Sequence, residues 1–167
     1  MDPITFIPAQ TTPFPIDGDQ EVDLAVTLGP KAKKPLQLKV PLLISGMGYG
    51  VGLSEQTRLS LTKAAKNVGT AINYGEGPVL SEEIEAAGKY ILQFSKAGWA
   101  KDEKLIKRAD MIEIKLGQGA LYGMGKSIQP KDIEGRAREA MGLKENEEAL
   151  LGEHFFENQT IGDLKEL

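Results

Sequence analysis

The sequence predicts an α/β fold with parallel strands, and two observations support this prediction. Short apolar runs alternate with helical segments along most of the 167 residues, and strand–helix–strand crossovers of this kind force the strands to run parallel. The predicted strands also end in glycine-rich loops, at 46–52, 75–77 and 117–125. Each loop follows the carboxyl end of a strand, which is the edge of an α/β fold where ligands bind.

The composition is that of an ordinary globular protein, with 41% hydrophobic and 26% charged residues. The net charge is −4 and both signs are interspersed, so we expect no nucleic-acid partner. The absence of cysteine excludes disulfides, thiol nucleophiles and thiolate-bound metals within the chain, and a single histidine argues against a histidine-rich metal site. No apolar window of about 18 residues or signal peptide is visible, so we expect a cytoplasmic protein with no membrane contact.

Residues 1–40 are expected to form an arm and a hairpin. Residues 1–21 hold four of the nine prolines, which predicts an extended segment lying over a neighbouring surface. Residues 22–28 alternate like a strand, and 36–40 form a second short strand after a turn-like stretch. We therefore divide the chain into this arm and hairpin and an α/β part at 41–167.

The first helix is expected at 54–69, because Ser54 is a good N-cap and Gly69 a good C-terminal stop. Its spacing of apolar residues predicts one buried stripe. The stripe consists of Leu61, Ala64, Ala65 and Val68.

The remaining elements alternate less regularly. Short strands are expected at 70–77 and 111–117, and short helices at 81–87 and 102–110, whereas 90–95 fits a strand or a helical turn equally well. Residues 132–153 are expected to be helical in two pieces split at Gly142, and a last helix follows Thr160.

About three parallel strands are too few for a closed barrel, which needs eight. A partial barrel leaves open strand edges and an uncovered apolar face. We therefore expect the chain to be the amino-terminal part of something larger. The remainder would lie on the same polypeptide, on another chain or on a second copy.

The strand at 111–117 carries charges where a parallel strand is normally apolar, because Glu113 and Lys115 lie two residues apart on one face. An uncompensated buried charge is costly, so both groups must be solvated, paired or bound to a ligand. One interpretation is an edge strand with a wet face. The other is that both residues face the interior of a barrel, where a lysine could neutralise a cofactor ring or a carboxylate substrate.

Other polar residues in the loops are weaker candidates. Gln118 would add a donor and an acceptor, and Glu76 and Asn73 fit either a solvated loop or a site. His154 has no Ser or Cys partner at a recognisable spacing, which favours packing over catalysis. The glycine spacing at 46–52 lacks the dinucleotide-binding fingerprint.

Three stretches, taken together, resemble the FMN-binding barrel domain of glutamate synthase and its relatives. They are L-I-S-G-M-G-Y-G at 43–50, I-N-Y-G-E-G at 72–77 and M-I-E-I-K-L-G-Q-G-A at 111–120. The corresponding family patterns are an S-x-M-S-F-G-like loop, N-T-G-E-G and E-I-K-x-x-Q-G-A-K-P-G-x-G-G. The resemblance extends over approximately residues 36–167, and its third stretch is the most specific.

The resemblance implies the amino-terminal portion of a (β/α)8 TIM barrel that uses FMN to reduce 2-iminoglutarate, formed from 2-oxoglutarate and ammonia, to glutamate. Lys115 and Glu76 would be its catalytic residues. The cofactor would be bound by Ser45, Gly46, Met47, Gly48, Asn73, Lys115 and Gln118. Any iron–sulfur cluster would come from residues outside this chain. The implied partners are the rest of the barrel, or a second copy, and a 2-oxo acid substrate.

Two positions depart from the family pattern. Leu121 replaces a lysine that helps to hold the substrate carboxylates, and Tyr74 replaces a small threonine near the flavin. Lys126 lies five residues from Leu121, too far along the chain for a simple replacement. Two alternatives therefore stay open: a different FMN-dependent oxidoreductase on the same barrel, or a non-catalytic fragment that acts as an interaction module. Enzymatic activity is expected only if the barrel is completed.

Overall fold

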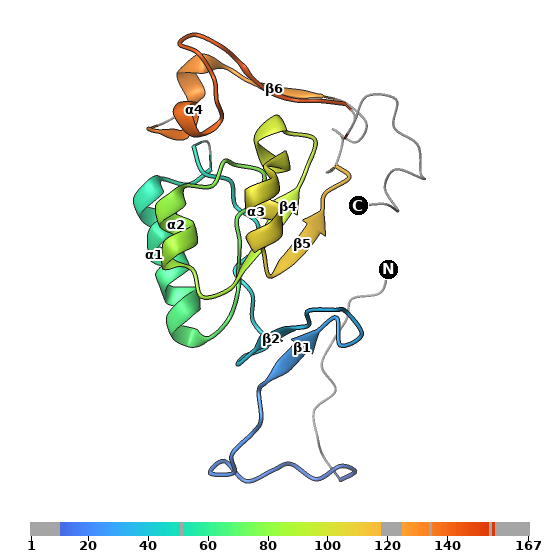
Figure 1. Ribbon diagram of the computed structural model, residues 1–167. Coiled ribbons are helices and arrows are strands. Elements are labelled where there is room, and N and C mark those ends of the chain that lie inside the picture. The colour runs from blue at the N-terminus through green and yellow to red at the C-terminus, as the bar shows by residue number, and fades with distance from the viewer. Residues whose placement is uncertain (1–10, 51, 118–124, 134, 154, 156–167) are drawn as a thin grey trace.

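The computed structural model describes residues 11–50, 52–117, 125–133, 135–153 and 155. Its centre is a parallel sheet of order β3-β4-β5, with helices packed on one face. One antiparallel pair of strands lies near each end of this unit, β1–β2 at one and β6–β7 at the other (Figure 1). The architecture is thus mixed α/β with a parallel sheet, as the sequence predicts.

The predicted hairpin is confirmed, with shorter strands. β1 (Val26–Leu28) pairs antiparallel with β2 (Leu36–Leu38). Leu36 and Leu38 are buried against Ala71 and Ile91, so the hairpin covers the amino-terminal end of the sheet face that the helices leave free. Residues 11–25 are exposed and form no helix or strand.

The first helix, α1 (Glu55–Val68), has the predicted ends, since the Ser54 side chain accepts from the Thr57 amide and Gly69 adopts a φ of +80°. The predicted stripe is largely wrong, because Ala64 and Val68 are exposed and Leu61 is only half-buried. The buried residues are Arg58, Thr62 and Ala65. Hydrophobic periodicity cannot identify this face, because two of its three buried residues are polar.

Two further helices are confirmed: α2 (Ser81–Ala86) and α3 (Glu103–Arg108), which follows a short 3-10 turn, η1 (Gly98–Lys101). The ambiguous segment is β4 (Tyr90–Phe94), and all five of its residues are buried. A central parallel strand covered on both faces needs no alternation, which explains why its pattern is undecided in the sequence.

The parallel strands are shorter than expected. β3 (Ile72–Asn73) pairs with β4, and β4 with β5 (Met111–Ile114). The predicted strand before the first glycine loop is reduced to one parallel bridge between Ile44 and Ile72. The Lys115 amide still donates to the Phe94 carbonyl at 2.9 Å, so the ladder continues one residue past β5.

The two helices predicted at 132–153 are mostly wrong. This region contains η3 (Pro130–Asp132), a single turn α4 (Ala137–Ala140) and a strand, β7 (Ala149–Leu151), that pairs antiparallel with β6 (Lys126–Ile128). Gly135 and Gly142 flank α4 with positive φ, a conformation that ends a helix. The helix predicted after Thr160 lies outside the described residues.

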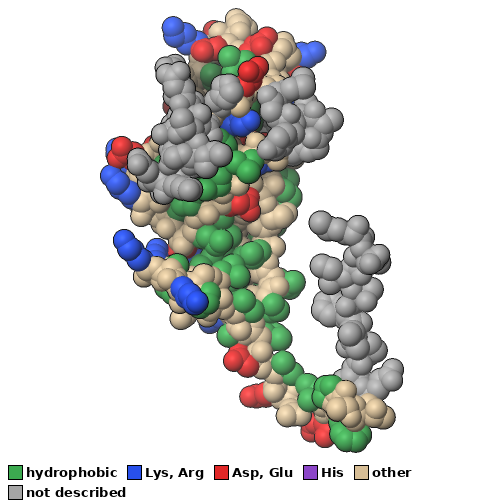
Figure 2. Space-filling model, turned by 90° about the vertical axis from the view of Figure 1, so that its right-hand side faces the viewer, with side chains coloured by type: hydrophobic (Ala, Val, Ile, Leu, Met, Phe, Trp, Pro, Cys, Tyr) green, Lys and Arg blue, Asp and Glu red, His purple; other side chains and the backbone are tan. Residues whose placement is uncertain are grey.

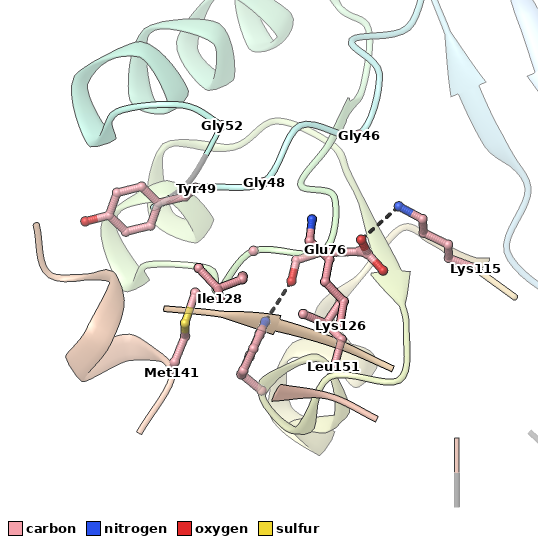
Figure 3. Close-up of a pocket in the computed structure, with 12 residues that line it drawn as sticks. Gly46, Gly48, Tyr49, Gly52, Glu76, Lys115, Lys126, Ile128, Met141 and Leu151 are labelled. Atoms are coloured by element: carbon pink, nitrogen blue, oxygen red, sulfur yellow. Dashed lines mark hydrogen bonds and ion pairs between the residues drawn. The ribbon is translucent and has the colours of Figure 1, made fainter. Parts of the chain in front are cut away.

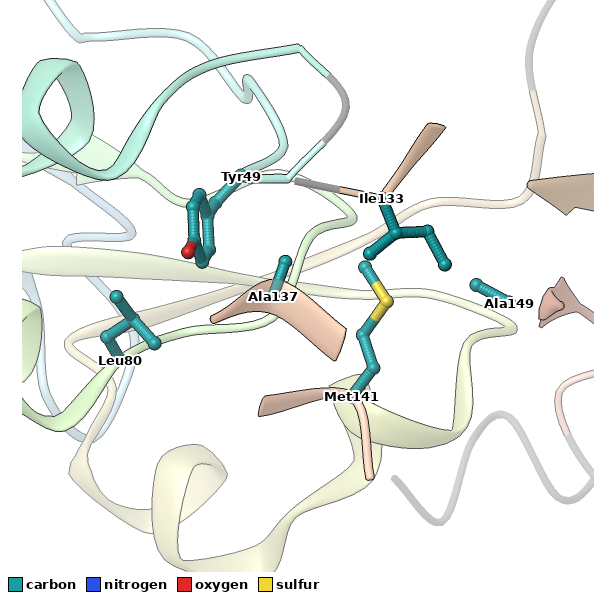
Figure 4. Packing of buried hydrophobic residues seen from close by; sticks show 6 residues of the cluster. All are labelled: Tyr49, Leu80, Ile133, Ala137, Met141 and Ala149. Carbon is teal, nitrogen blue, oxygen red and sulfur yellow. The ribbon is translucent and has the colours of Figure 1, made fainter. Parts of the chain in front are cut away.

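The segment at 125–153 packs on the rest of the molecule through its own apolar cluster. Figure 4 shows this cluster, in which Tyr49 and Leu80 contact residues of the segment, namely Ile133, Ala137, Met141 and Ala149. Arg136 adds ion pairs to Glu55 at 2.6 Å and Glu82 at 3.0 Å. No helix of the described part is long and apolar enough to cross a membrane.

Candidate functional site

Two of the predicted glycine loops meet at the carboxyl end of the sheet. A Cβ added at Gly48 would lie 3.1 Å from the Gly77 nitrogen, and one added at Gly77 would lie 2.4 Å from the Tyr49 nitrogen. Gly75 has a φ of +66°, which favours glycine. The glycines are therefore required for the two loop backbones to touch.

Lys115 and Glu76 come together beside these loops. The Lys115 ammonium lies 2.9 Å from Oε2 of Glu76, and the side chains are 21% and 28% exposed. Trp99 fixes the same loop by donating its indole N–H to the Glu76 carbonyl at 2.7 Å. The ion pair is thus partly shielded from water, and the backbone of Glu76 is fixed by Trp99.

Polar residues line the sheet face opposite the helices. Asn73 and Gln93 are buried on it, and Glu113 lies in register with Gln93 and accepts a hydrogen bond from its amide. Glu113 is exposed, which agrees with the interpretation of an edge strand with a solvated face. Lys115, two residues further along the chain, lies beside the glycine loops as the ion-pair partner of Glu76.

Gln93 is a site residue that the sequence did not single out. A Cβ at Gly46 would lie 3.0 Å from its Nε2 and 3.1 Å from Oδ1 of Asn73, so the first glycine loop rests on both amides. The Gln93 Oε1 atom is buried and lacks a hydrogen-bond partner among the described residues. In the sequence, Gln93 is a polar residue inside an apolar run. This position indicates a site residue only when 90–94 is known to be the central strand, β4.

A cavity of about 250 Å³ opens at this edge of the sheet (Figure 3). Glycines of both loops, with Glu76 and Lys115, form one part of its lining. Apolar side chains form another part, namely Trp99, Ile128, Met141 and Leu151. Lys126 also lines the cavity and forms no ion pair within the described ranges. The cavity therefore combines charged groups with an apolar wall contributed mostly by the segment at 125–153.

The predicted site residues are only partly brought together. Gly46, Gly48, Glu76 and Lys115 line the cavity, whereas Ser45, Met47 and Asn73 lie beside it without lining it. Gln118, Leu121 and His154 lie outside the described residues. In the part that the structure covers, no group of three or more His, Asp or Glu side chains could hold a metal ion.

The expectation that Tyr74 stands near the flavin is not supported by its position. Tyr74 is fully buried in the cluster beneath the helices, and its hydroxyl donates to the Glu83 carbonyl at 3.0 Å. Burial raises the pKa of Tyr74 to about 12. Consecutive residues of a strand point to opposite faces, so the ring lies on the helix side while Asn73 lies on the cavity side.

A buried ion pair behind the loops is not predicted by the sequence. Arg58 of α1 and Glu83 of α2 are each 1% exposed, with Nε of Arg58 3.0 Å from Oε1 of Glu83. Ordinary helix patterning assigns both residues to solvent.

The chain matches the sequence profile of one family, described as the conserved region in glutamate synthase, over residues 1–167. It is 33% identical over 145 residues to a glutamate synthase large subunit-like protein of Rhizobium meliloti, covering 86% of this chain and 33% of that protein. It is 30% identical over 151 residues to an archaeal-type glutamate synthase [NADPH] of Thermotoga maritima, covering 90% of this chain and 29% of that protein.

A third relative is an archaeal glutamate synthase [NADPH] of Methanocaldococcus jannaschii, which is 30% identical over 132 residues, or 79% of this chain and 26% of that protein. The chain thus spans about a third or less of the length of these relatives. No solved structure gives a significant match.

Proposed function

The chain belongs to the glutamate synthase family, and on that premise we propose that it forms the first part of an FMN-binding (β/α)8 barrel in a glutamate synthase-type oxidoreductase. The completed enzyme would reduce 2-iminoglutarate, formed from 2-oxoglutarate and ammonia, to glutamate. The observation that carries the proposal is the Lys115–Glu76 pair beside two touching glycine loops at the carboxyl edge of a parallel sheet.

The residues of this edge fit a flavin. A flat ring needs close approach to the backbone, and Gly46 and Gly48 expose their backbone along the cavity. The ammonium of Lys115 offers a positive charge, and the buried Oε1 of Gln93 is an acceptor still without a partner in the described part of the chain. Gly46, Gly48 and Lys115 would hold the ring, with Gln118 from the following loop.

The cavity is too small to hold the whole cofactor. Its volume is about 250 Å³, below the roughly 300–1,000 Å³ typical of ligand pockets. We therefore propose that the rest of the barrel, or a second copy of the chain, supplies the remaining wall and the phosphate-binding groups.

When bound and reduced, FMN would supply the hydride for the imine carbon. Lys115 would place a fixed positive charge where negative charge develops, a kind of stabilisation that is strong at a site withdrawn from water. Glu76 would hold the ammonium in place. Ile128, Met141 and Leu151 would limit the access of water to the reacting face.

Lys126 favours an acidic substrate. Lys115 is paired with Glu76, so the additional ammonium leaves the described lining of the cavity with a net positive charge. We propose that Lys126 binds a carboxylate of the 2-oxo acid. It would do so from a different position than the family's lysine, which Leu121 replaces here.

The test is to isolate the chain together with the polypeptide that completes its barrel. We expect a yellow complex that contains FMN and forms glutamate from 2-oxoglutarate and ammonia with a reduced electron donor. A folded but colourless complex without affinity for FMN would contradict the proposal. A flavin complex in which 2-oxoglutarate is inert would instead support a different oxidoreductase on the same barrel.

A further inference from the structure

The guanidinium of Arg58 is buried at the centre of a polar network on the helix side of the sheet. Its Nη2 donates to Oε2 of Glu83 at 3.0 Å, and its Nε lies 3.0 Å from Oε1 in an ion pair that lacks hydrogen-bond alignment. Oε2 of Glu83 also accepts from the Leu80 amide at 2.9 Å. Glu83 therefore fixes the guanidinium from α2.

The third nitrogen of this guanidinium reaches both glycine loops. Nη1 of Arg58 donates to the Tyr74 carbonyl at 3.2 Å and to the Met47 carbonyl at 3.4 Å. Met47 lies between Gly46 and Gly48 in the first loop, and Tyr74 immediately precedes Gly75 and Glu76 in the second. One side chain thus links the two loops at the point where their backbones touch.

The aromatic ring of Tyr74 completes the arrangement. Cζ of Arg58 lies 4.7 Å from the centre of this ring, and the Tyr74 hydroxyl donates to the Glu83 carbonyl at 3.0 Å. The guanidinium therefore contacts the second loop through both the backbone and the side chain of Tyr74.

The Arg58–Glu83 pair is poorly explained by stability alone. Burial lowers the pKa of Arg58 and raises the pKa of Glu83, so the loss of water disfavours both charges. A buried ion pair can often be replaced by apolar residues of similar volume without loss of stability. The guanidinium does provide fixed donor directions in one plane, which neither an apolar side chain nor lysine can reproduce.

We infer that Arg58 is a positioning residue of the candidate site. By holding the carbonyls of Met47 and Tyr74, it fixes the two glycine loops against each other and keeps Glu76 at ion-pair distance from Lys115. The inference rests on the proposed function only for the statement that this site acts on a substrate.

Two variants of the full chain separate positioning from stability. Arg58→Lys keeps one charge but cannot reach both carbonyls and Glu83 at once. The double variant Arg58→Met/Glu83→Met replaces the pair by apolar side chains. The reporters are the Asn73 amide, which donates to the Ile44 carbonyl, and the Gly75 amide, which donates to Oδ1 of Asn73.

We expect hydrogen exchange at the Asn73 and Gly75 amides to become at least about tenfold faster in both variants. The Gly69 amide at the end of α1 serves as the reference and should change less. The NMR signal of the Lys115 ammonium should shift toward its position in Glu76→Gln, in which the ion pair is absent. Urea unfolding of the double variant should remain close to that of the unmodified chain.

Unchanged exchange and an unchanged Lys115 signal in either folded variant would overturn the inference. If the double variant does not fold, an unchanged Arg58→Lys variant overturns it by itself, because the pair would then serve folding alone. These measurements need no flavin. If the completed protein fails to bind FMN while the loops still loosen in both variants, the proposed function fails and the positioning role stands.

Discussion

The ammonium of Lys115 lies 2.9 Å from the carboxylate of Glu76, although one residue follows the outer strand β5 and the other lies in the loop after β3. A second lysine–glutamate pair, Lys107 and Glu103, has the same separation on the surface of α3, where the side chains are 76% and 81% exposed. The two pairs differ in environment rather than in distance. This difference provides a matched control for the role of Lys115.

Replacing Lys115 by Gln in the completed enzyme should lower kcat by about 100-fold, the usual loss when one donor to a developing charge is removed. Lys107→Gln removes the same charge on the surface of α3 and should leave kcat unchanged. Steady-state kinetics on the purified flavoenzyme checks both. A Lys115→Gln enzyme that retains more than half the activity would show that Lys115 has no part in the reaction.

Gly77 should tolerate no side chain. A Cβ there would lie 2.4 Å from the Tyr49 nitrogen and 2.7 Å from the Tyr49 oxygen, and backbone atoms can yield only if the loops separate. We expect Gly77→Ala to lower the free energy of unfolding by about 1–3 kcal/mol, as overpacking does. Urea denaturation measures this difference.

The control for Gly77 is Gly98, because a Cβ at Gly98 would meet no atom within 4 Å. Gly98→Ala should change the free energy of unfolding by no more than about 0.5 kcal/mol. Equal losses in the two variants would mean that the close contact between the loops is absent in solution.

Tyr74 should make stability fall at alkaline pH. Burial raises its pKa from about 10 to about 12, so its ionised form is favoured in the unfolded chain. Below about pH 10 Tyr74 is protonated in both states, and its contribution to the free energy of unfolding is fully present. This contribution is lost as the pH rises through 12, and the loss is about 1 kcal/mol near pH 11. Unfolding of the chain and of Tyr74→Phe should therefore be compared at about pH 9 and pH 11.

The Phe variant keeps the ring but cannot ionise. Tyr49 and Tyr90 also have raised pKa values because of burial, so some alkaline loss will remain in the variant. The unmodified chain should lose more stability over this range than Tyr74→Phe. Equal losses would mean that the Tyr74 hydroxyl is solvated.

The parts of the fold that local chemistry determines could be predicted from the sequence. Ser54 and Gly69 bound α1 because a cap needs only its own neighbours. The buried face of α1 could not be predicted, because Arg58 is buried only where Glu83 and two loop carbonyls meet it. Those partners come from distant parts of the chain.

The same reason limits prediction at the site. Lys115 and Glu76 could be named as candidates, because a charge in a parallel strand and an acid in a glycine loop are unusual. The charged residues at 132–153 suit a helix surface and predict helices there. The strands in this part of the chain are fixed instead by pairing of β6 with β7 and by packing of Met141 and Ala149 in the apolar cluster that also contains Tyr49.

The outer edge of β5 should govern association of the isolated chain. Met111, Ile114 and Leu116 are 39%, 46% and 50% exposed, and β4 is the only strand that pairs with β5 among the described residues. Figure 2 shows hydrophobic side chains across the face of the molecule on this side. An exposed apolar edge strand recruits further strands, and a lysine on such an edge prevents this. We therefore expect Ile114→Lys to lower self-association of the chain, as measured by sedimentation velocity over a range of concentrations.

Val68→Lys is the matched control, because Val68 is 51% exposed but lies on α1, away from any strand edge. It adds the same charge and should leave the sedimentation profile unchanged. Equal effects of the two lysines would assign association to net charge rather than to the strand edge. If the unmodified chain sediments as a monomer at every concentration, then the edge of β5 does not mediate self-association. In that case the proposal that the rest of the barrel, or a second copy, completes this structure loses its physical basis.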